Sequence, residues 1–533
     1  MDHYNILYEP WIEVEKPDKT TEKVGLIECL KKADQYRRIR MHECKTHMDE
    51  FAVYRFIEAF LCAAYQPTED TILEIWEDEH FDMGIIQKYI EHCNKDGERF
   101  DMFGDNPFMQ VPKGQESLLK DIFPISKLDA TMRIGTEESF FGYQPGRKLQ
   151  DTYNMSMPQF IGSLLRNSFC AASIGSAGVS SLVVKGQPPI MFVVELDNLF
   201  QTLVANMPIM QERLYGIALP AWEQDEYLRD LSEITKSRCG YLEFAFYQTK
   251  GILITDMNED NVVKTYASEM KFSKNNKPKE YNKNAAVIEP HAIKINIDKT
   301  ESDRGLLVTS LDVIKTDIIQ SEWLSLFCFI AQDHKVFQSL NAIKNIKAIN
   351  DTFNNRIKKV TLRAYLLAVK TNNNQLTANR MFFANDDVPE ELFENRNNLV
   401  VAEEICEEIR ELGQSIRRAL RYAEAESGTN KDMRSVKVDY IQKSTVADVG
   451  AGVFYRKTKD IFFKDIIPKI CLCKTEEEYE AYKKNEKKRL WKCAKDTYWD
   501  TLLSKESLLV KEKYSHWIKG VKKKGTDNGK KVE

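Results

Sequence analysis

Apolar residues recur at helical spacing through much of the first 210 residues. In the stretch 49–65, for example, Phe51, Tyr54 and Ile57 fall on one face, which is typical of a helix with one buried side. Gly, Pro and Asp residues dominate 100–155, which we therefore expect to be mostly loops. The pattern predicts an extended segment over Tyr4–Ile12, a strand over Ile190–Val194, and helices over 49–65, about 68–79, about 84–94, about 157–172 and 198–207.

Two mostly apolar stretches further along flank a short polar tip. Leu362–Lys370 and Leu376–Phe383 are predicted to form the strands of a hairpin, and alternation over 241–254 and 286–310 predicts more antiparallel sheet. Asn tolerates the left-handed backbone of tight hairpin turns, and amide groups donate and accept hydrogen bonds as base edges do. The tip therefore predicts either an ordinary solvated turn or a stiff hairpin that inserts between base pairs. Its residues are Asn372, Asn373, Asn374 and Gln375.

A different pattern begins after Pro389. Ile405, Ile409, Leu412 and Ile416 step by three and four residues, which predicts a long amphipathic helix. Further helical patterns follow at about 440–468, 475–504 and 506–521, and four helices joined by short breaks predict an antiparallel bundle. The predicted fold class is therefore α+β, with a large mixed α/β N-terminal domain with antiparallel sheet over 1–385 and a C-terminal four-helix bundle over 386–533.

Composition places the 533-residue chain among globular proteins of two or three domains. It is 43% hydrophobic and 29% charged, and no stretch approaches the roughly 20 apolar residues of a membrane span. The first residues lack the basic and apolar regions of a signal peptide. Eleven cysteines are scattered singly, which suits a reducing compartment. We therefore expect a cytoplasmic protein.

Basic residues are concentrated near the C-terminus. Residues 481–533 hold 16 Lys and Arg against 7 Asp and Glu, although the net charge of the chain is −5. This asymmetry fits a region that faces a phosphate backbone, whereas the alternative is a solvated helix face. For the stretch after Gly520 we prefer the solvated interpretation. The candidate contacts lie on one predicted helix: Lys483, Lys484, Lys487, Lys488, Arg489 and Lys492.

No constellation of catalytic residues is evident. The chain lacks a phosphate-binding loop, a Gly-x-Gly-x-x-Gly fingerprint, a His-Glu-x-x-His motif and a Gly-x-Ser-x-Gly motif. The nearest approach to a metal site is His42, Cys44 and His47, but no Cys-x-x-Cys or second His pair completes a tetrahedral set. We therefore expect neither enzymatic activity nor a cofactor.

Five short segments occur in a fixed order between residue 5 and about 470. They are Asn5–Ile12, Phe100–Gln110, Leu219–Glu223, Gly240–Lys250 and Ala451–Arg456. The ordered set resembles the CasA family, whose members are the large subunit of the type I-E Cascade CRISPR surveillance complex. Tyr247 and Lys250 stand where that family's strand has Trp and Arg. The family's zinc-binding cysteines, present in some members, are absent from this sequence.

The resemblance implies a DNA-recognition role without catalysis. CasA proteins bind the protospacer-adjacent motif (PAM) in duplex DNA, mostly from the minor groove, and wedge the duplex open so that the guide RNA can pair. Minor-groove readout is degenerate and depends on shape. The implied partners are the other Cascade subunits with their CRISPR RNA, target duplex DNA, the displaced non-target strand and a helicase–nuclease that cleaves the DNA.

The resemblance also assigns roles to particular positions. The family's wedge is a glutamine-tipped hairpin, matched by Asn374 and Gln375 with Asn372 and Asn373 on the approach. The bundle touches the displaced strand, for which the basic helix 483–492 is the candidate. The remaining matches are a PAM minor-groove loop at Gly175, Ser176, Ala177 and Gly178, a groove lysine at Lys277 or Lys279, and a guide-end docking loop at Phe141, Gly142, Tyr143 and Gln144.

Simpler alternatives remain at several of these positions. A helix C-cap explains Gly175 equally well, and an ordinary turn aromatic explains Phe141. For the whole chain, the first rival is an assembly scaffold that ignores DNA. The second rival is a metal enzyme built around His42, Cys44 and His47.

Overall fold

Helices and small antiparallel sheets make up the chain, so the predicted α+β fold class is confirmed. The chain divides into two compact units, Met1–Lys315 with Asp333–Asp386, and Thr316–Gln332 with Asp387–Glu533. The sequence predicted a single boundary near residue 385, which would leave residues 316–332 in the first unit. The structure groups them with the second unit instead. The structure is a computed structural model that describes residues 3–44, 47–95, 98–116, 119, 121–129, 153–170, 190–209, 219–223, 242, 251–258, 262–269, 293–302, 305–313, 323–324, 341–354, 356–372, 375–389, 392, 395–427, 445–503 and 508–519.

Helices make up much of the first unit among the residues described. They are α1 Leu26–Lys31, α2 His47–Tyr65, α3 Glu69–Asp78, α4 Met83–Cys93, α6 Met157–Cys170, α7 Leu199–Asn206 and α13 Asn341–Phe353. Side-chain oxygens of Thr68, Asp82 and Asn198 accept backbone N–H groups at the starts of α3, α4 and α7. The five predicted helices agree with the structure to within two residues at each end, and α1 and α13 are additional.

The N-terminal segment forms a turn before its first strand, so the extended segment expected over Tyr4–Ile12 is wrong. The Asn5 carbonyl accepts the N–H groups of Tyr8 and Glu9 at 3.0 and 2.9 Å, and the Asn5 side chain accepts that of Leu7 at 3.0 Å. Asn stabilises such turns because its side chain bonds to the backbone two residues on. The strand β1 Ile12–Glu15 then pairs antiparallel with β2 Thr21–Val24 and β3 Arg38–Ile39.

Two further antiparallel arrangements lie later in the first unit. Strand β8 Val262–Glu269 pairs with β4 Asp121–Pro124, β5 Met155–Ser156 and β7 Gly251–Met257. Strands β9 Ile293–Ser302 and β10 Gly305–Val313 pair with each other. Alternation in the sequence predicts β9, β10 and part of β7. It misses β8, and β4 interrupts the stretch that we expect to be loops.

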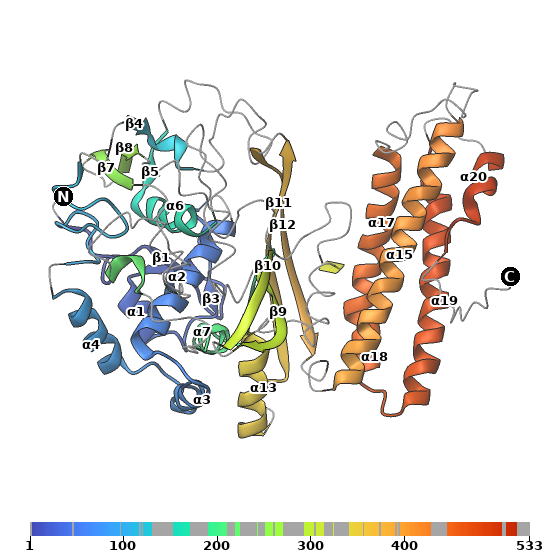
Figure 1. Cartoon of the computed structure of the whole chain (residues 1–533), viewed down its shortest axis with the longest axis horizontal. Helices are drawn as coiled ribbons and strands as arrows, with labels where there is room; N and C mark the ends of the chain where they lie inside the picture. The colour runs from blue at the N-terminus through green and yellow to red at the C-terminus, as the bar shows by residue number, and fades with distance from the viewer. Residues whose placement is uncertain are drawn as a thin grey trace. The chain divides into compact units, whose positions relative to one another are not determined.

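The predicted hairpin strands are both present and both longer than expected. They are β11 Lys359–Asn372 and β12 Gln375–Pro389, and β11 also pairs with β6 Ile190–Glu195. The strand order is β12-β11-β6, so β11 is the central strand of a three-stranded sheet. Figure 1 shows β11 and β12 as the longest strands of the first unit.

Three of the segments that carry the family resemblance meet on one buried aromatic ring. Phe56 of α2 is fully buried, and its ring centroid lies 6.0 Å from that of Trp11, 5.3 Å from that of Phe108 and 5.3 Å from that of Trp222. The contacts of Phe56 with Phe108 and Trp222 are edge-to-face, an arrangement that stabilises a core beyond simple area burial. These three landmarks therefore serve the fold of the first unit.

The second unit is built around one long central helix (Figure 1). Its elements are α15 Arg396–Ser427, α17 Thr445–Ile461, a π-helical turn η7 Phe462–Ile466, α18 Ile467–Ile470, α19 Glu476–Asp500 and α20 Leu508–Ser515. The predicted apolar stripe from Ile405 to Ile416 is buried in α15. The last helix is shorter than the 506–521 expected. Trp323 joins this unit, because its ring packs on Phe462 and Phe463.

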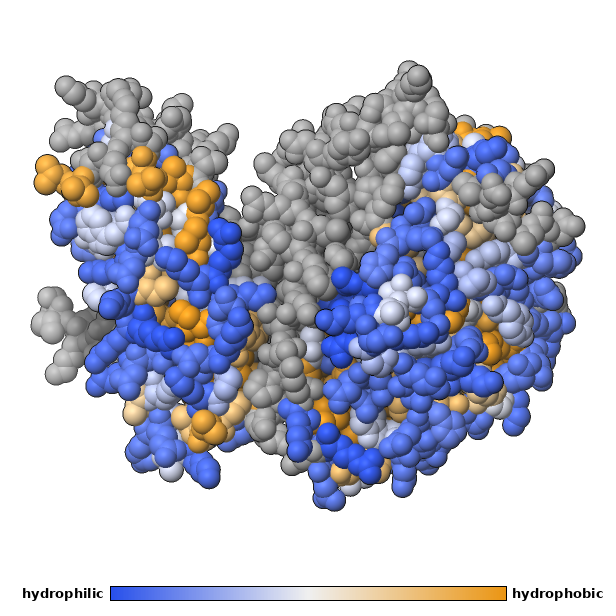
Figure 2. Space-filling view, turned by 180° about the vertical axis from the view of Figure 1, so that it is seen from behind, coloured by the Kyte–Doolittle hydropathy of each residue, from blue (hydrophilic) through white to orange (hydrophobic). Residues whose placement is uncertain are grey.

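Polar residues cover most of the surface seen in Figure 2. Hydrophobic residues gather at one end of the second unit in this view. The exposed hydrophobic residues of that unit include Val449, Leu502, Leu508 and Leu509. None of the helices in the part of the chain that the structure describes combines the length and apolar character of a membrane span.

Candidate nucleic-acid interface

The hairpin extends beyond the strand that supports it. β11 pairs with β6 from Thr361 opposite Glu195 to Leu366 opposite Ile190. Strand β11 then continues to Asn372. Among the described residues, its last six residues, 367–372, have no partner in β6. At the rise of a strand, this part of β11 is about 20 Å long. Because β6 runs antiparallel to β11, the chain enters β6 at Ile190 on the tip side of the hairpin.

A buried ion-pair network fixes the base of this hairpin. Arg363 lies four residues inside β11 and is fully buried. Its guanidinium lies 2.7 Å from Glu50 Oε1 on α2 and 2.7 Å from Glu195 Oε1 at the end of β6. A buried Arg is stable only with such anionic partners, because an unpaired charge in the interior costs several kcal/mol. The base of β11 is therefore tied to α2 as well as to its neighbouring strand.

The network continues to the small N-terminal sheet. Arg38 of β3 lies 3.7 Å from Glu195 Oε2 and 3.0 Å from Glu15 Oε1 of β1. Burial raises the pKa of Glu195, while the nearby Arg363 and Arg38 oppose that rise. The Tyr54 hydroxyl accepts the Ile39 N–H at 2.9 Å and donates to Glu195 at 3.5 Å. Charged residues of α2, β1, β3 and β6 therefore form one ion-pair network with Arg363 at the base of the hairpin.

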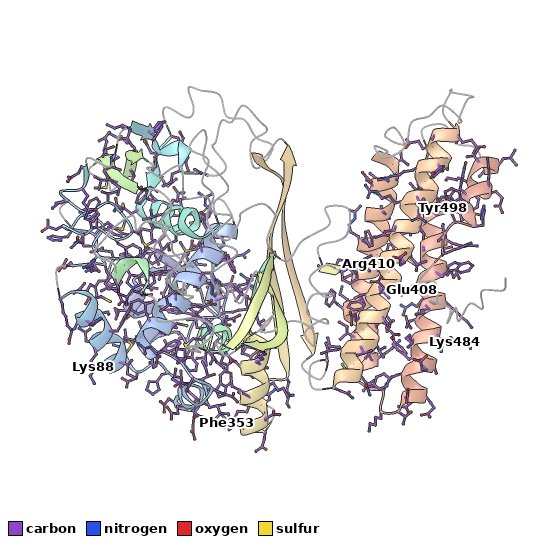
Figure 3. All side chains as sticks on the ribbon, viewed as in Figure 1. Lys88, Phe353, Glu408, Arg410, Lys484 and Tyr498 are labelled. Atoms are coloured by element: carbon purple, nitrogen blue, oxygen red, sulfur yellow. The ribbon has the colours of Figure 1, made fainter. Side chains whose placement is uncertain are left out.

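Half of the predicted strand-contact residues on α19 are instead partly neutralised inside the second unit. Lys483 pairs with Glu404 of α15 at 2.6 Å and also with Glu480. Lys487 lies 3.6 Å from Glu408 of α15. Arg489 pairs with Asp465 of η7, and hydrogen bonds from Lys469 and Arg489 lower the pKa of Asp465. These three cations bind α19 to its neighbours, a role that a count of charges along the sequence does not reveal. Figure 3 shows Glu408 and Lys484 in this unit.

The other half faces solvent. Lys484, Lys488 and Lys492 are exposed, and none of them forms an ion pair with any residue that the structure describes. Their four-residue spacing places them on one face of α19. Trp491 and Lys495 share that face and are not among the predicted contacts. The signal was available, because an aromatic residue interleaved with lysines at helical spacing is a nucleic-acid pattern.

Most of the positions matched to the family's DNA contacts lie outside the described residues. Asn372 is the last residue of β11, and Gln375 is the first residue of β12. The other matched positions remain predictions from the sequence. They are Asn373, Asn374, Phe141, Gly142, Tyr143, Gln144, Gly175, Ser176, Ala177, Gly178, Lys277 and Lys279.

The structure does not bring His42 and Cys44 to a common site. His42 Nδ1 lies 2.9 Å from Glu13 Oε1, and the His42 N–H donates to the other carboxylate oxygen at 2.8 Å. The Cys44 thiol packs against α6, where a Cβ at Gly162 would lie 2.8 Å from its sulfur, and burial raises the pKa of the thiol well above its usual range. The side chain of His47 lies outside the described residues. Within the described residues, the group close enough to share an ion is His3, Glu98 and Asp101.

In that group, the Asp101 carboxylate already accepts hydrogen bonds from the backbone. The buried Asp101 carboxylate accepts the N–H groups of Tyr4 and Phe103 at 3.2 and 2.8 Å, and His3 Nδ1 lies 2.6 Å from its second oxygen. These bonds join the segment at residue 5 to the segment at residue 100, together with the bridge between Asn5 and Asp101. The carboxylate therefore holds two family landmarks together.

Comparison with known proteins identifies the fold and the family. The family of the CRISPR-associated protein Cse1 matches residues 5–502. No curated protein matches the chain. Among solved structures, a crystal structure of CasA from Thermus thermophilus aligns over 97% of this chain and 98% of that one, with 17% identity and a TM-score of 0.67. Thermobifida fusca Cse1 aligns over 97% and 96%, with 17% identity and a TM-score of 0.62. A chain of a CRISPR RNA-guided surveillance complex aligns over 97% and 98%, with 14% identity and a TM-score of 0.66.

The α+β architecture, with a hairpin-bearing first unit and a helical second unit, is thus the fold of the CasA structures. The chain belongs to the CRISPR-associated Cse1 family, which is the CasA family of type I-E Cascade, and the predicted resemblance is confirmed. Members of this family are structural subunits of Cascade. The chain therefore has a role in a CRISPR surveillance complex.

Proposed function

We propose that this chain is the non-catalytic DNA-recognition subunit of its Cascade complex. It binds the PAM through the minor groove, wedges the duplex open beside it to start R-loop formation, and helps recruit a helicase–nuclease. In this proposal Gln375 pries, Asn374 helps to hold the opened pair, and the loop Gly175–Gly178 with Lys277 or Lys279 reads the groove. The loop Phe141–Gln144 docks the chain at the guide end of the complex.

The observation that carries the proposal is a long two-stranded arm on a fixed base. Opening the first base steps costs a few kcal/mol of lost stacking, and an inserted side chain offsets this only if its support does not yield. Arg363 ties the base of β11 to Glu50 and Glu195 at 2.7 Å each, in a fully buried position. An anchored arm of this kind supports a wedge better than it supports an ordinary surface turn.

The topology also favours groove reading next to the wedge. The segment that contains Gly175–Gly178 precedes Ile190, where the chain enters β6 on the tip side of the hairpin. Groove contact and strand opening can then act on adjacent base pairs, as PAM-dependent opening requires.

Binding of PAM-containing duplexes by the reconstituted complex tests this function. The complex is assembled from guide RNA and the other Cascade subunits, with or without this chain, and offered a target duplex with a functional or a scrambled PAM. We expect tight binding and strand opening only with the chain and the functional PAM. Equal binding of both duplexes, or equal binding without the chain, contradicts the proposal.

The scaffold alternative rests on the ion pairs of α19, since Lys483, Lys487 and Arg489 bind their own unit. Reversing the charge of the exposed set Lys484, Lys488 and Lys492 separates the two functions. A DNA-recognition subunit loses affinity for target DNA in this variant. An assembly scaffold keeps that affinity unaltered.

A further inference from the structure

A cavity of about 620 Å³ lies in the first unit, where the C-terminal end of α3 and the N-terminal end of α7 meet. Its other walls are the turn after α1, which contains Asp34, and the segment Arg356–Lys358 that leads from α13 into β11. Figure 1 shows α3, α7 and α13 in this part of the first unit, and the three helices pack on one another. The volume is in the range of ligand-binding sites.

Hydrogen bonds hold the walls of the cavity in place. At the start of α7, backbone N–H groups donate to the carbonyls of Ala33 and Tyr36, on either side of Asp34, at 3.0 and 2.8 Å. The buried side chain of Asn350 bonds to both the N–H and the carbonyl of Ile357 at 2.9 Å. A ligand therefore meets a preformed site and does not have to order its walls.

The cavity combines an apolar floor with a charged rim. Trp76 and Phe200 line it and are buried, so their side chains form the floor. Asp34, Asp197 and Lys358 also line it and are exposed, and none of the three forms an ion pair with any residue that the structure describes. The rim therefore offers two carboxylates and one ammonium group to a ligand.

The surrounding charge favours a cationic ligand. Arg356 is partly neutralised, because its guanidinium lies 3.6 Å from the Glu79 carboxylate of α3. The first four N–H groups of α7 already donate within the protein, so this helix start offers no site to an anion. From Gln66 to Gln87 the sequence holds seven Asp and Glu and no Lys or Arg. This field attracts cations and opposes the phosphates of a nucleic acid.

We propose that the cavity is a docking site for an extended peptide segment of another protein, in which Lys or Arg lies beside an apolar residue. The cationic side chain of the peptide lies between Asp34 and Asp197, and its apolar side chain covers Trp76 and Phe200. Lys358 has donors only, so it binds backbone carbonyls of the peptide, which a polyamine does not offer. This protein-binding site is separate from the DNA recognition proposed above and does not depend on it.

Selection of short random peptides displayed on phage against the immobilised full-length chain tests the site, with fluorescence anisotropy of the most enriched peptide as the readout. We expect enriched peptides to carry Lys or Arg beside an apolar residue. The double change Asp34→Asn and Asp197→Asn should weaken binding of that peptide about tenfold, because its cation loses both carboxylates. Gln201→Trp, which fills the cavity from α7, should weaken binding at least as much.

Glu91→Gln with Asp351→Asn is the matched control. It removes two exposed carboxylates of the first unit that do not line the cavity, so binding should stay unchanged. Unaltered thermal unfolding shows that each variant is folded. Four results overturn the proposal: no enrichment of basic peptides, equal binding by the wild type and the double variant, equal binding by the wild type and Gln201→Trp, or displacement of the peptide by an equal concentration of spermidine.

Discussion

Tyr89 connects a family landmark to the helical core of the first unit. Its hydroxyl donates to Glu223 and accepts the Trp222 Nε1–H at 2.9 Å, while Trp222 packs on Phe56. Burial raises the pKa of Glu223 above its ordinary 4.5, and the hydrogen bond from Tyr89 and the nearby His92 and Arg99 oppose the rise. The landmark is visible in the sequence, but its partner Tyr89, 134 residues away from Glu223, is not.

Glu223→Gln tests whether burial of the ionised Glu223 carboxylate destabilises the folded protein. Because the folded-state pKa of Glu223 is raised, its contribution to stability is fully present below the unfolded value and is lost as pH rises through the folded pKa. We therefore expect the variant to unfold at a higher temperature than the wild type at pH 7, with the difference shrinking toward pH 4. Thermal unfolding followed by circular dichroism across this range measures it. A difference that grows as pH falls contradicts the assignment.

Arg363 gives a second test at the residue scale. Arg363→Met leaves Glu50 and Glu195 buried without their shared cation, so we expect a loss of about 3–5 kcal/mol in the free energy of unfolding. Adding Glu195→Gln to Arg363→Met should recover part of this loss, because one of the two buried carboxylates that no longer contact Arg363 is then neutral. Urea unfolding is the measurement.

Arg37→Met is the matched control, since Arg37 is partly exposed and 4.0 Å from Glu15. It should change the free energy of unfolding by less than about 1 kcal/mol. Equal losses from Arg37→Met and Arg363→Met would show that the buried network is not what holds the hairpin base.

At the scale of elements, apolar periodicity in the sequence predicts helices and strands well. It does not predict which residues far apart in the chain form ion pairs. Most helices of both units and the strands beside the amide tip follow from apolar spacing, whereas α1 and α13 were not predicted. The pair between Arg363 and Glu50 joins residues 313 positions apart, and no local pattern indicates it. On α19 the sequence likewise predicts a basic helix, but only packing against α15 and η7 separates its inward cations from its outward ones.

This separation predicts opposite effects from two triple variants of α19. Changing the outward Lys484, Lys488 and Lys492 to Ala should weaken DNA binding and leave the free energy of unfolding within about 1 kcal/mol of the wild type. Changing the inward Lys483, Lys487 and Arg489 to Ala should lower the unfolding midpoint, because α19 loses its ion pairs with Glu404, Glu408 and Asp465. Binding assays and thermal unfolding on both variants make the comparison, and identical profiles contradict it.

At the scale of the whole molecule, the family landmarks and the DNA-facing positions are different residues. Trp11, Phe108 and Trp222 meet on Phe56 in the core, so they identify the fold, and hence the family, from sequence alone. The groove, docking and tip positions lie in polar segments of the sequence, where no apolar periodicity indicates a role. They are therefore assigned by the family resemblance alone. Fold and family were therefore predictable from the chain, whereas the binding residues rest on the proposal and its tests.

Opening of the first base pair beside the PAM tests the central claim most directly. A target duplex with 2-aminopurine at that position is mixed in stopped flow with the reconstituted complex that carries the wild-type chain or the double change Asn374→Ala and Gln375→Ala. A wedge predicts that opening slows about tenfold or more, equivalent to about 1.4 kcal/mol of lost support, while affinity for the PAM duplex falls much less. An opening rate equal to that of the wild type contradicts the wedge.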